Sequence, residues 1–292
     1  MKKTVIGKRQ LSHSQNFLQN PGFVRSLIDK TDLKAGDLVV EIGSGKGIVT
    51  KLLVEKGCRV IGIELDNQLF ASLVKQFKGC SNVEIVKADF LKWNLPSKPY
   101  KVFSNIPFNM TTDIVTKLLN GENSPEVAYL ILQDKAAERF IGDPLTKDTQ
   151  ISILLKPYFE MAIVSKINRK QFTPTPNIGA VLAMFRRKQR PLVEPQFYQL
   201  FRDFIVYGYN QWKPTVLETF ERVFSTKQRS ILEHEITAIR KAKPRDLKID
   251  QWLILFESFQ NYVAEDKKNL VRGAEKRLKD QQRVLHKQHR TR

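Results

Sequence analysis

The 292-residue sequence contains little cysteine and no long apolar run, and both shortages exclude classes of protein. Its two cysteines, Cys58 and Cys80, have neither the spacing of a metal site nor the number of a disulfide framework, so we expect structural roles in a reducing cytoplasm. No run approaches the roughly 18 apolar residues of a membrane-spanning helix, and neither end shows a lipidation signal. The start also lacks the apolar segment of a secretory signal. We therefore expect a cytoplasmic protein without a membrane or metal partner.

Charge of one sign, by contrast, is in clear excess. Forty-nine Lys and Arg against 30 Asp and Glu give a formal net charge of +19. This excess indicates a polyanionic partner, and nucleic acid is the first candidate. An anionic membrane surface is the second, but the missing apolar run and lipidation signal argue against it. The last 27 residues, 266–292, hold ten basic and three acidic side chains. Such a tail is either a solvated segment or a helix that forms on a polyanion.

From about residue 37, short β-branched runs alternate with helical patterns, which is typical of a parallel sheet covered by helices. The sequence predicts five such strands, over residues 37–43, 59–65, 83–89, 100–106 and 127–133. Residues 160–172 and 180–188 are predicted to close the sheet as an antiparallel pair. Aromatic-rich helical patterns without strands follow residue 190. We therefore place a domain boundary near residue 188.

The first chemical motif is EIGSGKG, residues 41–47, between a predicted strand and a predicted helix. Its glycines let the backbone approach a ligand closely, because no Cβ intervenes. The G-x-G-x-G spacing differs from the G-x-G-x-x-G of sites that bind a pyrophosphate. The acidic Glu41 at its start suits a cofactor with positive charge, such as S-adenosylmethionine. Taken alone, the motif is equally compatible with an ordinary tight turn.

Two carboxylates follow at the ends of the next predicted strands. Glu64 lies where an acidic side chain accepts hydrogen bonds from both ribose hydroxyls of a nucleotide. Asp89, in KADF, is placed to accept from an adenine amino group. Either residue alone could be a surface residue at a strand end. Together with the glycine turn, at the carboxyl edge of one parallel sheet, they predict an adenosine pocket.

Six motifs together resemble one family. They are HSQNFL at 13–18, EIGSGKG at 41–47, IEL at 63–65, KADF at 87–90, NIPF at 105–108 and FTPTP at 172–176. In this order and spacing they resemble the Erm rRNA adenine N6-methyltransferases, and secondarily the related small-subunit rRNA dimethyladenosine transferases. The resemblance runs from about residue 8 to about 262 and leaves the basic tail outside. SQNFL and the Ile of NIPF favour the Erm branch, whereas Phe108 departs from the Tyr of many relatives.

The resemblance implies the contacts of S-adenosylmethionine residue by residue. Asn16 and Leu18 would belong to a segment that covers the cofactor, and Gly43 and Gly45 would contact its methionine part. Glu64 would contact the ribose, Ala88 and Asp89 the adenine, and Asn105 would contribute from the catalytic side.

NIPF alone could be an ordinary turn, but the resemblance implies that its four residues are catalytic. The side-chain oxygen of Asn105 and the carbonyl of Ile106 would accept the two N6 hydrogens of the target adenine and aim its lone pair at the methyl group. Pro107 would stiffen the turn by fixing its own φ, and Phe108 would stack on the base, a contact worth about 1–3 kcal/mol. The base must first leave its helix or loop. Phe172 is either a second stacking face or a core aromatic.

The implied fold is α/β, a Rossmann-like S-adenosylmethionine-dependent methyltransferase sheet with helices on both faces, plus a smaller all-α C-terminal domain. We expect a methyltransferase domain over 1–188, a helical RNA-binding domain over 189–265, and a basic tail over 266–292 that is disordered without RNA. RNA would lie between the two domains.

The implied function is N6-methylation of one adenine in 23S rRNA, by a monomer acting before full ribosome assembly. This would confer macrolide, lincosamide and streptogramin B resistance. One alternative is a 16S rRNA adenine dimethyltransferase of ribosome maturation. Another is a non-catalytic RNA-binding factor on a methyltransferase fold, against which the intact NIPF argues.

Overall fold

The computed structural model describes residues 17–121 and 123–290, which form two compact units. The sheet unit contains the described residues up to 137 together with 160–187, and the helical unit contains 138–159 and the chain from 188 onward. The second junction between the units lies between residues 187 and 188. Residues 138–159 differ from the expected division, because the apolar side chains of Ile153 and Leu154 pack into the core of the helical unit.

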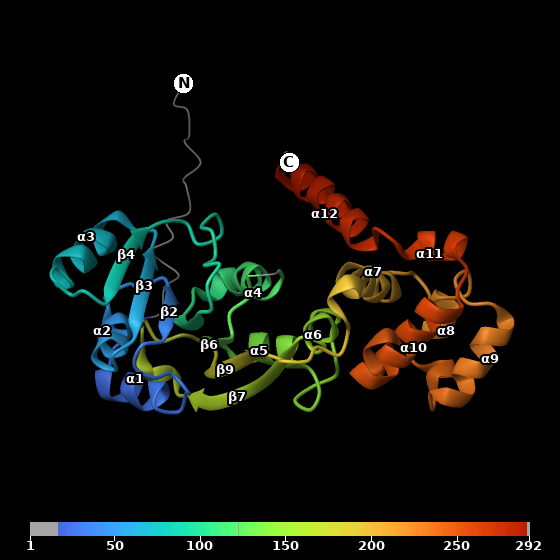
Figure 1. The fold of residues 1–292 in the computed structure, drawn as a ribbon, viewed down its shortest axis with the longest axis horizontal. Coiled ribbons are helices and arrows are strands. Elements are labelled where there is room, and N and C mark those ends of the chain that lie inside the picture. The colour runs from blue at the N-terminus through green and yellow to red at the C-terminus, as the bar shows by residue number, and fades with distance from the viewer. Residues whose placement is uncertain (1–16, 122, 291–292) are drawn as a thin grey trace, which may run out of the picture. The chain divides into compact units, whose positions relative to one another are not determined.

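A seven-stranded sheet with the order β4-β3-β2-β5-β6-β9-β7 forms the centre of the sheet unit (Figure 1). Its strands are β2 (Leu38–Ile42), β3 (Arg59–Glu64), β4 (Val83–Lys87), β5 (Lys101–Asn105), β6 (Val127–Gln133), β7 (Phe159–Ile167) and β9 (Ala180–Arg187). Strands β2 to β6 pair in parallel, and β9 pairs antiparallel to β6. The predicted strands and the predicted fold class are confirmed. Because β3 and β5 lie on opposite sides of β2, the strand order reverses at β2, and ligands of open α/β sheets bind at such a point.

Helices flank this sheet and begin at residues that suit helix starts. They are α1 (Pro21–Ile28), α2 (Ile48–Glu55), α3 (Asn67–Gln76), α4 (Thr111–Leu119) and α5 (Asp134–Ile141). Asn20 caps α1 by accepting from the Phe23 amide at 3.1 Å, and Asp66 caps α3 in the same way. A two-residue strand, β1 (Phe17–Leu18), pairs antiparallel with β8 (Phe172–Thr173). This pairing holds the SQNFL and FTPTP motifs together.

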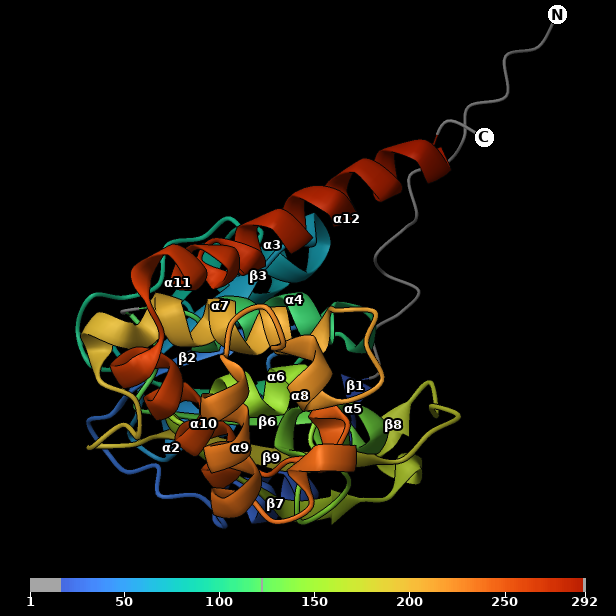
Figure 2. The ribbon, with the colours of Figure 1, turned by 90° about the vertical axis from the view of Figure 1, so that its right-hand side faces the viewer.

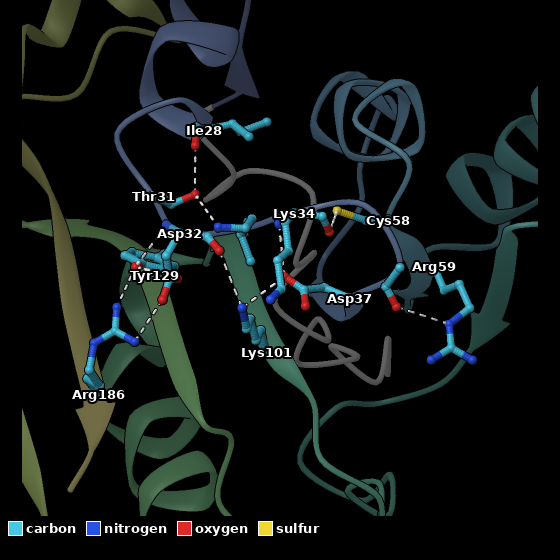
Figure 3. A network of polar contacts seen from close by, with 12 residues as sticks. Ile28, Thr31, Asp32, Lys34, Asp37, Cys58, Arg59, Lys101, Tyr129 and Arg186 are labelled. Carbon is cyan, nitrogen blue, oxygen red and sulfur yellow. Dashed lines mark hydrogen bonds and ion pairs between the residues drawn. The ribbon is translucent and has the colours of Figure 1, made fainter.

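A polar network joins the amino ends of the parallel strands β2, β5 and β6 to the carboxyl end of the antiparallel strand β9 (Figure 3). Lys101 pairs with Asp37 at 2.8 Å, and Arg186 pairs with Asp32 at 2.8 Å. Tyr129 donates its hydroxyl hydrogen to Asp32 at 2.9 Å. Partial burial acts to raise the pKa of Asp32, but the bonds from Arg186 and Tyr129 outweigh it and hold that pKa below its usual range. The network therefore connects the segment after α1 to strands β2, β5, β6 and β9.

The helical unit is built around aromatic side chains. Its helices are α6 (Gln150–Leu155), α7 (Tyr198–Tyr209), α8 (Val216–Thr219), α9 (Thr226–Glu235), α10 (Ile249–Tyr262), α11 (Glu265–Val271) and α12 (Ala274–Arg290). Phe204 stacks on Phe220 with ring centroids 4.7 Å apart, and Trp252 meets Phe204 edge-on. A Cβ at Gly208 would lie only 2.6 Å from the Trp252 ring, so α7 requires glycine there. The described residues include no helix long and apolar enough to cross a membrane.

The structure corrects the expected separate tail over 266–292. Residues 265–271 and 274–290 form α11 and α12. Glu275 is 7% exposed and is bound through both carboxylate oxygens by Arg202 of α7. The start of the tail is therefore part of the helical unit, because a paired charge and apolar contacts fix it there. Charge composition alone could not show this.

Candidate active site

The glycine turn after β2 has the backbone geometry that only glycine adopts readily. Gly43, Gly45 and Gly47 have φ values of +73°, +55° and +77°, in the left-handed region. A Cβ on Gly45 would lie 2.9 Å from the Phe17 ring, and one on Gly43 would lie 4.0 Å from Cδ of Pro107. The glycine turn and the NIPF turn are thus immediate neighbours, although about 60 residues separate them in the chain.

Glu64 lies beneath this turn at the end of β3. It is 1% exposed, and its carboxylate accepts from the backbone amides of Gly45 at 2.8 Å, Leu65 at 2.8 Å and Asp66 at 2.9 Å. A carboxylate offers about four lone-pair sites, so these bonds leave capacity for one further donor. Glu64 thus fixes the glycine turn and also lines the adjacent cavity. Sequence reasoning assigned it only the ribose contact.

Glu41, the acidic residue that opens the motif, is buried behind the turn. Its carboxylate accepts from the hydroxyls of Ser44 at 3.0 Å and Thr50. Burial raises the pKa of Glu41 to about 8, and the nearby charge of Glu64 adds to the increase while the two hydroxyls oppose it. A cationic ligand group beside Glu41 would favour its charged form and release its proton.

This raised pKa makes the stability of the protein dependent on pH. Between the ordinary value near 4.5 and about 8, the folded chain holds a proton on Glu41 that the unfolded chain has lost. The free energy of unfolding should therefore decrease as pH rises through this window, by up to about 1.4 kcal/mol per pH unit. Glu41→Gln should flatten this part of the curve. Urea unfolding of both proteins at pH 5, 6, 7 and 8 measures the slopes, and parallel slopes would show that Glu41 is charged when folded.

The NIPF turn begins where β5 ends. The side chain of Ser104 accepts from the amide of Ile42 at 3.2 Å and donates to its carbonyl at 2.6 Å, so one hydroxyl joins the ends of β5 and β2. The Pro107 carbonyl accepts from the Met110 amide at 3.0 Å, and the Phe108 carbonyl accepts from the Thr111 hydroxyl at 3.0 Å. These bonds fix the turn at the carboxyl edge of the sheet.

A cavity of about 590 Å³ opens beside the two turns, within the size range of small-ligand pockets. Five residues predicted to contact cofactor or substrate line it: Gly43, Glu64, Ala88, Asp89 and Pro107. A small adjoining space of about 30 Å³ is lined by four more groups from the prediction or its motif: Leu18, Gly45, Glu41 and Asn105. Asn16 lies outside the described residues. The structure therefore gathers most of the predicted set at one edge of the sheet.

The two aromatic residues differ in exposure. Phe108 is half-buried, whereas Phe172 is 1% exposed and belongs to the core of the sheet unit. Their rings meet edge-on with centroids 6.1 Å apart. Of the two roles considered for Phe172, the structure favours a core aromatic that supports Phe108 over a second stacking face.

Three residues at this site were missed from the sequence. Phe17 lines both cavities, and the ammonium of Lys46 lies 5.4 Å from the centroid of its ring. Lys117 of α4 donates to the carbonyls of Phe90 and Trp93 and so holds the segment after Asp89. Phe17 is part of the SQNFL motif, so the sequence could have indicated that it lies at the site. Lys117 belongs to no motif, and only the tertiary fold places it near the segment after Asp89.

The site fits a positively charged nucleoside ligand in charge and size. Among residues 17–121 and 123–290, no three His, Cys, Asp or Glu gather as metal ligands. A turn that has no room for a Cβ at Gly45, two buried carboxylates and a cavity of about 590 Å³ match the charge and size of S-adenosylmethionine. That cofactor, when bound, supplies an electrophilic methyl group on a sulfonium.

The reversal of strand order at β2, with the cavity at the carboxyl ends of β2, β3 and β4, is the arrangement of S-adenosylmethionine-dependent methyltransferases. The sequence profile of the ribosomal RNA adenine dimethylase family matches residues 7–261, and the chain belongs to that family. It is an rRNA adenine N6-methyltransferase, as the resemblance indicated.

Individual relatives come from two branches of this family. The rRNA adenine N-6-methyltransferase of Bacillus licheniformis is 25% identical over 266 residues, which cover 91% of this chain and 92% of the relative. The ribosomal RNA small subunit methyltransferase A of Moorella thermoacetica is 32% identical over 222 residues, 70% of this chain and 76% of the relative. The crystal structure of the 23S rRNA methyltransferase ErmE matches with a TM-score of 0.75 and 25% identity, over 84% of this chain and 100% of that one.

Proposed function

We propose that the protein transfers methyl from S-adenosylmethionine to N6 of one adenine in 23S rRNA and thereby confers macrolide, lincosamide and streptogramin B resistance. The observation that carries the reaction is the contact of the NIPF turn with the glycine turn beside the cavity. The likeness to ErmE over 84% of the chain supports the choice of 23S rRNA. In this proposal the protein acts as a cytoplasmic monomer on RNA that is not yet fully assembled.

The proposed roles follow the positions of the residues. Asn105 and the Ile106 carbonyl hold the target amino group in the orientation that exposes its lone pair, and Phe108 stacks on the base. Gly43 and Gly45 give the ligand access to the backbone, while Glu64 and Asp89 face its ribose and adenine. Placement of two reactants then accounts for most of the rate, and no strong general base is required.

A second candidate, methylation of 16S rRNA, is supported by a specific comparison. Identity to the small-subunit enzyme of Moorella thermoacetica is 32%, against 25% for the Bacillus licheniformis enzyme, although over a shorter length. Both candidates use the same site and differ in the RNA.

One assay separates the two candidates. Deproteinised 23S rRNA, deproteinised 16S rRNA and 30S particles are each incubated with the full-length protein and labelled cofactor, and the modified base is located by primer-extension arrest. Label in 23S rRNA at a single adenine is expected. Label confined to 16S rRNA or 30S particles would establish the second candidate, and transfer to none of the three would contradict both.

The proposed role of Phe108 predicts a difference between two substitutions. Phe108→Tyr should stay active because the aromatic face is kept, whereas Phe108→Ala should lose about 10-fold or more in turnover with loss of base stacking. Because Phe108 also contacts Phe172, Phe108→Ala will lower stability somewhat. Thermal unfolding and turnover are measured on the same preparations. Activity that recovers fully at a lower temperature, where Phe108→Ala is folded, would assign Phe108 to packing only.

A further inference from the structure

We propose that α12 is an RNA-binding arm, fixed to the helical unit at its first residues and presenting a row of basic side chains to phosphates of the substrate RNA. The family profile ends at residue 261, so this arm lies outside the shared part of the chain. The inference rests on the proposed rRNA substrate but applies equally to 23S and 16S rRNA.

The first turn of α12 is held by side chains of α7. Arg202 donates from Nε and Nη2 to the two carboxylate oxygens of Glu275, at 2.9 Å and 2.8 Å. Asp203 accepts from the backbone amides of Gly273 at 2.8 Å and Glu275 at 3.0 Å. Two amides at the start of α12 are therefore capped by a neighbouring helix. Val271 and Ala274 are buried in the same core. The direction of α12 is therefore set by the protein.

Basic residues recur along α12 at helical spacing. Positions 276, 279 and 283 are separated by three or four residues, which places them on one face of a helix. The described side chains of Lys279 and Arg283 are 60% and 78% exposed, and Lys276 is also exposed. The row spans about 10 Å, from roughly 7 steps of about 1.5 Å. Figures 1 and 2 show the C-terminal part of α12 extending away from the other helices of its unit.

The acids of α12 neutralise this row only in part. Six basic and two acidic residues, within 274–290, leave α12 with a net charge of +4. Glu275 contacts Lys279 at 2.8 Å, but its carboxylate is shared with Arg202 of α7. Asp280 lies 3.6 Å from Arg283, a distance at which an exposed pair contributes little. The row therefore keeps most of its attraction for an anion.

The chemistry of α12 favours RNA over a membrane surface. A helix that binds in the membrane interface needs a broad apolar face opposite its basic one. Leu278 is partly buried against the core of the helical unit and is not available to a membrane. Of the described side chains that follow Leu278 in α12, Val284 is the exposed apolar one. Phosphate contact requires only charge and position, and it supplies affinity that falls steeply with salt.

The test neutralises the row in the full chain rather than removing it, because truncation at residue 266 would leave Arg202 buried without Glu275. The arm variant is Lys276→Gln, Lys279→Gln and Arg283→Gln. The control, Lys34→Gln, Lys51→Gln and Lys78→Gln, makes the same charge change at exposed positions of the sheet unit.

Binding to 23S and 16S rRNA fragments is measured over a range of salt concentrations. For the arm variant, the slope of log affinity against log salt should become shallower by roughly 2 to 3, at about 0.7–0.9 for each phosphate that the variant no longer neutralises. The control should keep the slope of the parent. Equal slopes for arm variant and parent, or equal decreases in both variants, would overturn the proposal. Binding of the parent to anionic phospholipid vesicles that is abolished in the arm variant, with an unchanged RNA slope, would assign α12 to a membrane surface instead.

A second measurement does not depend on affinity. The exposed Cys80 is replaced by Ser, and Cys58 is buried and should not react. An RNA-cleaving reagent is then attached to the thiol of the Arg283→Cys variant. It should cut bound rRNA within a few nucleotides of one position, and absence of cleavage in a complex that forms normally would also overturn the proposal. Neither result depends on methyl transfer, so failure of the arm and failure of the proposed function are distinguishable.

Discussion

Asn105→Ala should lower methyl transfer by about 100-fold or more, a loss of the size found when one positioned polar group is removed from a reacting centre. Asn105 ends β5 and lines the space beside Gly43 and Gly45, where its side chain is proposed to hold the amino group of the target adenine. Affinity for S-adenosylmethionine, measured by calorimetry, should change less than tenfold, because other residues provide most of the proposed cofactor contacts.

Two further variants sharpen this result. Asn105→Asp keeps an acceptor oxygen in the same place and should retain more activity than Asn105→Ala. Asn94→Ala removes an exposed amide outside the site and should leave turnover unchanged. If cofactor affinity fell in Asn105→Ala as far as turnover does, the residue would act mainly on the cofactor, and the proposed role would be wrong.

Arg202→Leu should destabilise the helical unit by about 3–5 kcal/mol, because it leaves Glu275 buried without its main partner. Burial acts to raise the pKa of Glu275, but the bond from Arg202 outweighs it and lowers the pKa to about 2. This contribution is present above the ordinary value of 4.5 and disappears as pH falls toward 2. Urea unfolding at pH 7 and at pH 3 should therefore show a smaller difference between parent and variant at the lower pH.

A double variant separates the contribution of the Arg202–Glu275 ion pair from the cost of leaving Glu275 charged and unpaired. Arg202→Met combined with Glu275→Leu replaces both groups by apolar ones, and such exchanges of buried pairs are often neutral or stabilising. We expect the double variant to unfold close to the parent. Arg272→Leu removes the ion pair with Glu265, which is more exposed than the Arg202–Glu275 pair. It should not lower the free energy of unfolding comparably. A double variant as unstable as Arg202→Leu would show that shape, and not charge, fixes α12.

The sequence predicted the sheet unit well because its central strands, such as β2 and β6, are buried on both faces. The β2, β3 and β6 segments read as apolar runs. Glu41 and the glycine turn lie at the end of β2 and Glu64 at the end of β3, so spacing along the chain translates into one edge of a parallel sheet. The resemblance then supplied Asn105 and Phe108, which periodicity cannot distinguish from an ordinary turn.

What escaped prediction depends on contacts between distant segments. Lys117 reaches the Phe90 and Trp93 carbonyls from α4, and no local pattern marks it. The anchoring of α12 depends on Arg202, 73 residues before Glu275, and the charge of the tail gives no sign of that partner. Phe172 could be assigned only from its burial.

The hydroxyl of Ser104 has a consequence for how enzymes of this kind diverge. Strands β2 and β5 pair at Val39 and Val40, and at Ile42 they are joined through this side chain. A hydroxyl both donates and accepts, which an apolar side chain of that size cannot do. The alignment of β2 and β5 at the reactive edge thus depends in part on one oxygen atom outside NIPF and EIGSGKG. A chain could inherit both motifs unaltered and still lose their alignment through drift at this single neighbouring position.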